Sequence, residues 1–210
     1  MTETASQTVV GTDGRPLLAR GQRTRQRLLE AAEEVFAEHG YHDASIVKIT
    51  ESAGVAQGTF YLYFAGKKDI FEDLVRDLNR RVRRAMSEAA AEGETRVEAE
   101  LLGFRGFFRF TAEHRALYRI IRQAEFVSPE TLQLHYDRLS GGYVEALRRA
   151  MESGEIAQGN PEVLAWALMG IGELIGMRYI LWEGGEQVPE AVLAEIGRIV
   201  QCVLTPEAAT

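Results

Sequence analysis

The sequence predicts an all-α protein of about nine helices. Apolar residues recur at helical spacing along most of the chain, and no segment shows the apolar–polar alternation of a half-buried strand. Pro129, Pro161 and Pro189 each stand where the first turn of a helix accepts proline. These signals predict helices near 24–39, 67–91, 95–112, 114–126, 129–153, 161–183 and 189–204, with two short helices between 46 and 64.

The N-terminal 20 residues precede two expected domains. Residues 1–20 carry Thr, Ser, Gly, Asp and Pro with little apolar periodicity and are predicted to be a flexible arm. Residues 21–66 are expected to form the first domain, and residues 67–210 a second domain that begins with a long helix. The arginines in and after the arm, Arg15, Arg20, Arg23 and Arg25, form either a solvated tail or a segment that follows DNA phosphates or enters the minor groove.

Composition excludes several classes of protein. A content of 46% hydrophobic and 26% charged residues is ordinary for a globular protein. No apolar run reaches the roughly 18 residues of a membrane span, and the N-terminus lacks the apolar segment of a signal peptide. We therefore expect a cytoplasmic protein without a membrane partner. Cys202 is the only cysteine, so an intrachain disulfide is excluded.

Charge is distributed unevenly along the chain. The net charge is −7, yet residues 15–68 hold eight Arg or Lys residues against six acids. Four of those acids lie on the first predicted helix, away from the turn that follows it: Glu30, Glu33, Glu34 and Glu38. A basic N-terminal region on an acidic body indicates that a polyanion binds at one end only.

Residues 46–64 have the pattern of a helix-turn-helix. Ser45 precedes the first short helix and offers an N-cap oxygen, and Gly54 follows it, where a sharp turn favours glycine. The second short helix carries Phe60, Tyr63 and Phe64 at i, i+3 and i+4, the spacing that anchors one face of a helix. Together the two helices predict a DNA-binding motif.

The motif Gly58-Thr59-Phe60-Tyr61-Leu62-Tyr63-Phe64-Ala65-Gly66-Lys67 extends this pattern. With it, residues 23–71 resemble the N-terminal domain of the tetracycline-repressor (TetR) family of transcriptional regulators. The rest of the chain resembles the family only in length and helicity. The resemblance implies a homodimer that binds a palindromic operator in double-stranded DNA, most often as a repressor, and that is released by a small molecule.

DNA contacts are expected from the exposed face of the second helix and from groups around it. Gln57 is the best candidate for base recognition, because glutamine can pair bidentately with adenine. The resemblance implies that Tyr63 and Lys67 contact phosphates and that Ser45 and Lys48 hold the flanking backbone. The full predicted set is Arg23, Arg25, Ser45, Lys48, Gln57, Gly58, Thr59, Tyr61, Leu62, Tyr63 and Lys67.

An effector pocket is expected in the second domain, where aromatic residues and arginines are mixed with glycines inside helical segments. An aromatic stripe on a helix can equally be plain core. A largely apolar ligand would fit the mixture, and an anionic end, as in an acyl or aromatic thioester, would meet an arginine. The predicted lining is Phe107, Phe108, Arg109, Arg119, Arg122, Phe126, Tyr136, Tyr143, Trp166 and Met169.

The dimer interface is expected on the last two long helices, as the resemblance implies. The helix near 161–183 is apolar almost all round, so it must be covered on more than one side. Gly172 and Gly176 would allow a close helix approach, although both helices could also be plain monomer core. The predicted interface is Leu168, Gly172, Ile175, Gly176, Tyr179, Val192, Ile196, Ile199, Val200 and Val203.

Enzymatic signals are weak in this sequence. His39 and His42 have no third ligand, and no phosphate-cradling loop, nucleophile elbow or H-E-x-x-H motif occurs. We predict no catalytic residue, metal or cofactor. The alternative is an all-α lipid-binding or enzyme domain with an incidental helix-turn-helix, which would show no salt-dependent DNA binding.

Overall fold

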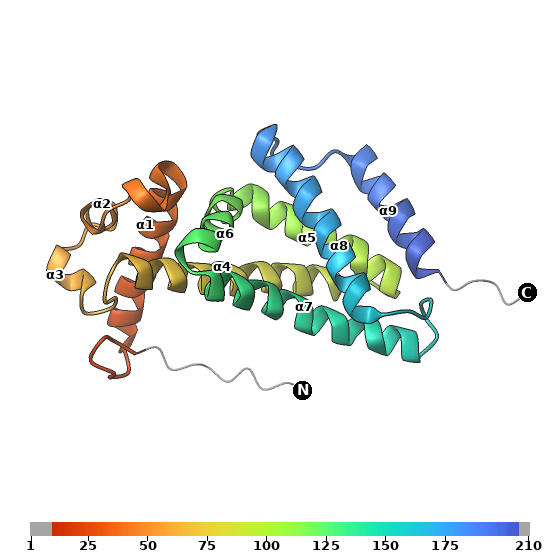
Figure 1. The fold of residues 1–210 in the computed structure, drawn as a ribbon, viewed down its shortest axis with the longest axis horizontal. Helices are drawn as coiled ribbons and strands as arrows, with labels where there is room; N and C mark the ends of the chain where they lie inside the picture. The colour runs from red at the N-terminus through yellow and green to blue at the C-terminus, as the bar shows by residue number, and fades with distance from the viewer. Residues whose placement is uncertain (1–9, 206–210) are drawn as a thin grey trace, which may run out of the picture. The chain divides into compact units, whose positions relative to one another are not determined.

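The protein is described by a computed structural model that covers residues 10–205 (Figure 1). Within that range every regular element is a helix, apart from one isolated bridge between Val10 and Pro16, so the all-α prediction is confirmed. The elements are α1 (Ala19–Asp43), α2 (Ile46–Ser52), α3 (Gln57–Phe60), α4 (Lys67–Ala90), α5 (Arg96–Glu113), α6 (Ala116–Val127), α7 (Pro129–Glu152), α8 (Pro161–Gly176), the π-helix η1 (Met177–Trp182) and α9 (Glu190–Leu204).

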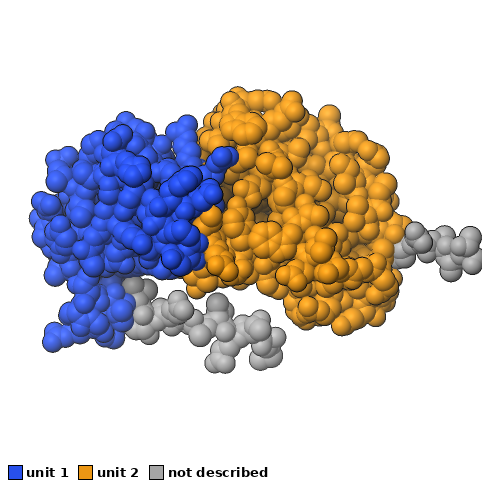
Figure 2. All heavy atoms as spheres, viewed as in Figure 1, with its two compact units in different colours: residues 1–76, 119–131 blue, residues 77–118, 132–210 orange. Residues whose placement is uncertain are grey.

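The chain forms two compact units, coloured separately in Figure 2. Unit 1 holds residues 1–76 and 119–131, and unit 2 holds residues 77–118 and 132–210. Unit 1 thus includes the start of α4 and most of α6, which the sequence analysis placed in the second domain. Residues 1–9 of the predicted arm lie outside the described residues, whereas residues 10–18 form a turn that leads into α1.

The helix-turn-helix of unit 1 follows the local signals in the sequence. Ser45 caps α2, because its side chain accepts a hydrogen bond from the Lys48 amide. Gly54 adopts φ 61°, the left-handed conformation that the turn requires. α1 extends five residues further toward the N-terminus than predicted. It also continues through a kink at Gly40, where φ is 71°.

Unit 2 contains a hydrophobic core built mainly from α5, α7, α8, η1 and α9. Asn160 caps α8 by accepting hydrogen bonds from the amides of Glu162 and Val163 at 2.9 and 3.2 Å. Gly106 of α5 marks a close helix approach. A Cβ at this position would lie only 2.8 Å from the carbonyl oxygen of Ala85 on α4.

The segment Pro161–Trp182 is long and apolar enough, by length and composition alone, to cross a membrane, with a mean hydropathy of 1.4 over its most apolar stretch. A search of the sequence for uninterrupted apolar runs does not find it, because Glu173 and Arg178 interrupt the segment. Ala165, Leu168 and Ile180 on one side of it belong to the core of unit 2. The segment is therefore a core helix with one side uncovered.

Candidate nucleic-acid interface

The recognition helix α3 is short, and buried aromatic side chains hold its inner face in place. Phe60 and Phe64 are fully buried, and their ring centroids lie 5.5 Å apart. Because these two rings fix the inner face, Gln57 and Gly58 are exposed, and Tyr61 and Leu62 are 47% and 61% exposed. Thr59 and Tyr63 are half-buried at the edge of the same surface. The motif thus offers an amide, a phenol and an accessible backbone to a ligand.

Ser45 and Lys48 stabilise the start of α2. The Ser45 Oγ accepts the Lys48 amide at 3.2 Å, and the Lys48 ammonium donates to the Asp43 carbonyl oxygen at 3.3 Å. Both residues are half-buried. Their first role is therefore to fix the helix, and contact with a DNA backbone stays a prediction.

Arg23 and Arg25 have different surroundings, although the sequence predicts both as DNA contacts. Arg23 is exposed on α1. Arg25 forms an ion pair with Asp73 of α4, and its guanidinium lies 5.1 Å from the centre of the Phe64 ring. The Arg25 donors that face Asp73 tie α1 to α4 within unit 1.

Arg27 has a structural role that its place in the sequence does not indicate. Its guanidinium donates to the carbonyl oxygens of Ala53 and Gly54, at the end of α2. These carbonyls have no partner within the helix, so the arginine satisfies them. No local pattern identifies this role, because Arg27 is 26 residues away from Ala53 in the sequence.

Lys67, predicted as a phosphate contact, has its donors engaged elsewhere. Its ammonium donates to the carbonyl oxygens of Tyr41, His42 and Ala44 at 2.7, 3.1 and 2.8 Å, and lies 4.5 Å from the centre of the Tyr41 ring. An ammonium group has three N–H donors, and all three are used. Lys67 therefore holds the C-terminal end of α1, and its contact with a phosphate stays a prediction.

Lys67→Ala is expected to lower the free energy of unfolding of unit 1 by about 1.5–3 kcal/mol, because it removes charge-assisted hydrogen bonds and leaves carbonyls unsatisfied. Lys68→Ala is the matched control, since Lys68 is exposed and pairs only at 3.7 Å with Glu72, and should change stability by less than about 0.5 kcal/mol. Urea denaturation measures both. If the two variants had equal free energies of unfolding, the structural role of Lys67 at the end of α1 would be contradicted.

The predicted effector residues do not come together in one unit. Arg119, Arg122 and Phe126 belong to unit 1, and the other seven belong to unit 2. Arg119 donates to the Ala37 carbonyl oxygen at 3.1 Å, and Phe126 is 83% exposed. The predicted lining is therefore divided between the two units.

Inside unit 2, the aromatic residues of the predicted pocket meet carboxylates. The Tyr136 hydroxyl donates to both carboxylate oxygens of Glu173 at 3.0 Å, and the Tyr143 hydroxyl donates to Glu100. Burial raises the pKa of Glu100 despite the nearby Arg96. Arg109 is exposed on α5. The aromatic residues Tyr136 and Tyr143 thus have carboxylate partners here, and an effector contact with Arg109, Arg119 or Arg122 stays a prediction.

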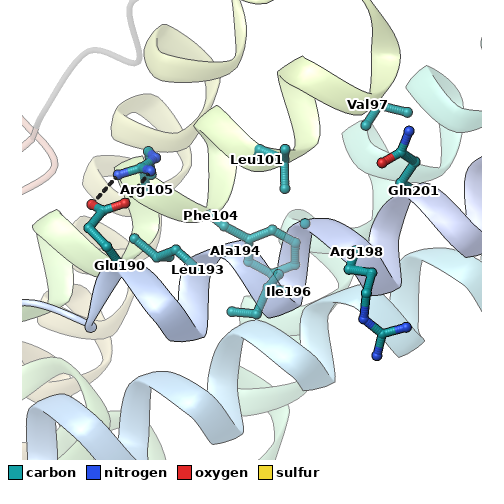
Figure 3. A pocket seen from close by; sticks show the side chains of 11 residues that line it. Val97, Leu101, Phe104, Arg105, Glu190, Leu193, Ala194, Ile196, Arg198 and Gln201 are labelled. Carbon is teal, nitrogen blue, oxygen red and sulfur yellow. Dashed lines mark hydrogen bonds and ion pairs between the residues drawn. The ribbon is translucent and has the colours of Figure 1, made fainter.

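A separate open cavity of about 390 Å³ lies between α5 and α9 (Figure 3). Leu101, Phe104 and Ile196 contribute its apolar surface. Arg105 and Glu190 are joined across one end by two hydrogen bonds of 2.7 Å, as the figure shows. No local sequence pattern indicates this cavity, because it depends on the packing of two helices that are far apart in the chain.

Most of the residues predicted for the dimer interface are buried or half-buried within unit 2 itself. Leu168, Ile196 and Val200 belong to its core, with Ile175, Tyr179 and Val192 packed against it. A Cβ at Gly172 would lie 3.2 Å from the Phe104 ring, and one at Gly176 would lie 1.9 Å from the Tyr118 hydroxyl oxygen. The glycine face therefore points into the unit, which corrects its predicted use between subunits.

Other apolar residues of α8, η1 and α9 are exposed. Ile199 and Val203 of the predicted interface are 37% and 48% exposed. Four further residues of these helices are also exposed: Val163, Trp166, Leu174 and Trp182. The sequence predicts Trp166 as part of the effector pocket and assigns the other three to neither site. The exposed apolar surface of α8, η1 and α9 is defined by these six residues.

Comparisons with known proteins agree with the motif. Residues 28–74 match the family described as bacterial regulatory proteins, tetR family. The HTH-type transcriptional regulator YdgC of Bacillus subtilis is 30% identical over 194 residues, which cover 90% of this chain and 96% of that protein. The fatty acid metabolism regulator protein of the same organism is 34% identical over 138 residues, 63% of this chain and 71% of that protein.

Solved structures share the fold. The transcriptional regulator FadR from Bacillus subtilis, in complex with stearoyl-CoA, superposes with a TM-score of 0.74 at 24% identity, covering 83% of this chain and 96% of that chain. The architecture of a helix-turn-helix followed by a helical body is therefore common to both. The chain belongs to the tetR family of bacterial regulatory proteins and is a DNA-binding transcriptional regulator.

Proposed function

We propose that this regulator represses transcription in the cytoplasm as a homodimer on a palindromic operator, and that a largely apolar effector releases it. The observation that carries the DNA-binding half of the proposal is the anchored helix α3. The buried Phe60 and Phe64 leave Gln57, Gly58 and Tyr61 free on one surface. Small and donor groups on such a helix suit the major groove.

Gln57→Ala is expected to relax the preference at one base position of the operator, at a cost of about 1–3 kcal/mol there. Gln57 is exposed at the first position of α3, so its truncation leaves the buried anchors intact. Operator sequences selected from random duplex DNA with the wild type and the variant measure this change.

Gln133→Ala is the matched control, because Gln133 is an exposed glutamine of unit 2. It should yield the wild-type operator sequence. An unchanged sequence preference for Gln57→Ala would remove the assigned role in base recognition. A wild type that selects no sequence, and binds DNA without salt dependence, would refute the proposed function itself.

The homodimer is supported by the exposed apolar surface of α8, η1 and α9. Leu174 is 61% exposed, and Val163, Trp166 and Trp182 are exposed on the same segment. Large exposed apolar residues on one segment favour an interaction site. A second copy is the occupant we propose, because a palindromic operator needs two recognition helices related by a two-fold axis.

The effector is proposed to bind in unit 2, whose interior is rich in aromatic side chains. Phe104 and Phe108 stack with centroids 6.0 Å apart, and Phe107 meets the edge of Tyr118 at 6.3 Å. The relative with bound stearoyl-CoA supports an acyl thioester as the ligand class. Effector and DNA would favour different states of the protein, so that each weakens the binding of the other.

Stearoyl-CoA is expected to release a selected operator duplex, whereas coenzyme A alone is not. Burial of an acyl chain contributes roughly 25 cal/mol per Å² before ordering costs, and coenzyme A lacks that chain. Fluorescence anisotropy of the labelled duplex measures release. Stearate separates the chain from the thioester, and release by coenzyme A alone would contradict an apolar effector.

A further inference from the structure

Unit 2 holds a carboxylate beside the aromatic side chains of its interior. Glu173 lies near the end of α8 and is half-buried. Its two carboxylate oxygens accept the Tyr136 hydroxyl, each at 3.0 Å, and the centroids of the Tyr136 and Trp166 rings are 5.7 Å apart. The carboxylate is therefore held in one place by a neutral donor from α7.

The same carboxylate acts on a second phenol, that of the buried Tyr118. Burial and the Glu173 charge raise the pKa of the Tyr118 hydroxyl. This hydroxyl lies against Gly176, one turn after Glu173 on α8, and the Tyr118 ring meets the edge of the Phe107 ring at 6.3 Å. Glu173 thus borders the aromatic interior to which we assign the effector.

The negative charge of Glu173 is not balanced by a basic side chain. Within residues 10–205, no ion pair involves this carboxylate. Glu100, the other interior carboxylate bound by a tyrosine, differs in this respect, because it forms an ion pair with Arg96 while Tyr143 donates to it. A phenol stabilises a carboxylate by a hydrogen bond but leaves its charge in place. A second anion brought close to Glu173 would therefore be repelled.

We propose that Glu173 determines which acyl compounds the effector site accepts. Chains that end in an uncharged group, such as a thioester or an ester, bind, whereas free fatty acids are rejected. A free carboxylate beside Glu173 would bring two negative charges together, but a thioester carbonyl carries no charge. This inference rests on the proposed function and deepens it, because it names the chemical form of the acyl chain that is recognised.

The test compares stearate with methyl stearate, which has the same chain without the charge. Both are supplied from cyclodextrin so that neither aggregates, and stearoyl-CoA is the reference. Fluorescence anisotropy measures release of a labelled duplex from the operator selection. The wild type should need about tenfold or more stearate than methyl stearate for half-maximal release, because like charges in the site repel.

Glu173→Gln removes the charge but keeps an oxygen that can accept the Tyr136 hydroxyl. It should lower the stearate concentration for half-maximal release by about tenfold or more, and leave the value for methyl stearate unchanged. Glu162→Gln is the matched control, because Glu162 is an exposed acid of the same helix. It should leave both concentrations as in the wild type.

Tyr136→Phe separates the charge of Glu173 from its contact with α7. The variant lacks the hydroxyl that donates to Glu173 but keeps the carboxylate, so it should still reject stearate. If Tyr136→Phe admitted stearate as Glu173→Gln does, the selectivity would come from the contact between α7 and α8, and the role proposed for the charge would be wrong.

The negative results have different meanings. A wild type that is released neither by stearoyl-CoA nor by methyl stearate refutes the proposed effector, and this selectivity with it. A wild type released equally well by stearate and methyl stearate refutes the role of Glu173 alone, and this result needs no variant. A Glu173→Gln protein with the wild-type circular dichroism spectrum that still rejects stearate also refutes that role alone.

Discussion

Leu174→Arg is expected to convert the dimer to monomers and to lower affinity for the selected operator by about a thousandfold or more, because one recognition helix alone retains little beyond non-specific binding. Leu174 is exposed within the apolar surface of α8, η1 and α9, so an arginine there would not disturb the core of the monomer. Light scattering measures the assembly and anisotropy measures the affinity.

Two controls accompany Leu174→Arg. Leu174→Met keeps the side chain apolar and should remain dimeric, and Gln133→Arg adds the same charge at an exposed position of unit 2. A Leu174→Arg variant that stays dimeric would place the interface elsewhere. Gly176→Arg is unsuitable for this test, because a side chain there would collide with Tyr118 inside the monomer.

Gly106→Ala is expected to lower the free energy of unfolding by about 1–3 kcal/mol, the usual cost of overpacking. The added Cβ would lie 2.8 Å from both the Ala85 carbonyl oxygen and the Ala89 Cβ. A backbone carbonyl in the middle of a helix cannot rotate away, so α4 and α5 would have to separate. Urea denaturation followed by circular dichroism measures the effect.

Gly103→Ala is the matched control on the same helix. Its Cβ would meet only the Ala90 Cβ at 3.8 Å, an ordinary contact. Alanine is favoured over glycine inside a helix by roughly 0.5–1 kcal/mol, so this variant should be more stable than the wild type. Destabilisation by both substitutions, or by neither, would contradict the assigned close approach at Gly106.

Local signals predicted the helices of unit 1 and most helix boundaries of unit 2. Ser45, Gly54 and Asn160 act through neighbouring residues, so their capping and turn roles can be recognised from a short stretch of sequence. The buried pair Phe60 and Phe64 likewise follows from spacing alone. These features determine the anchored recognition helix, and with it the family.

The remaining assignments depend on partners far away in the chain. Gly172 and Gly176 look suited to contact another subunit, but Phe104 and Tyr118 occupy that face within the monomer. The π-helix η1 follows α8 directly and is also rich in apolar residues, so composition does not mark the boundary between them. Lys67 reaches carbonyls more than 20 residues earlier, which no spacing rule indicates.

Lys67 is the first residue of α4 and also holds the end of α1. α4 runs on from this joint into unit 2. A displacement of α4 at its start would therefore strain this joint as well as the Arg25–Asp73 ion pair between the same two helices. Hydrogen bonds to a charged group contribute about 1.5–3 kcal/mol, the same size as a typical coupling of about 1–3 kcal/mol between two binding sites. Lys67 would thus contribute to the coupling together with the Arg25–Asp73 ion pair, and substitutions at either place should change the response to an effector.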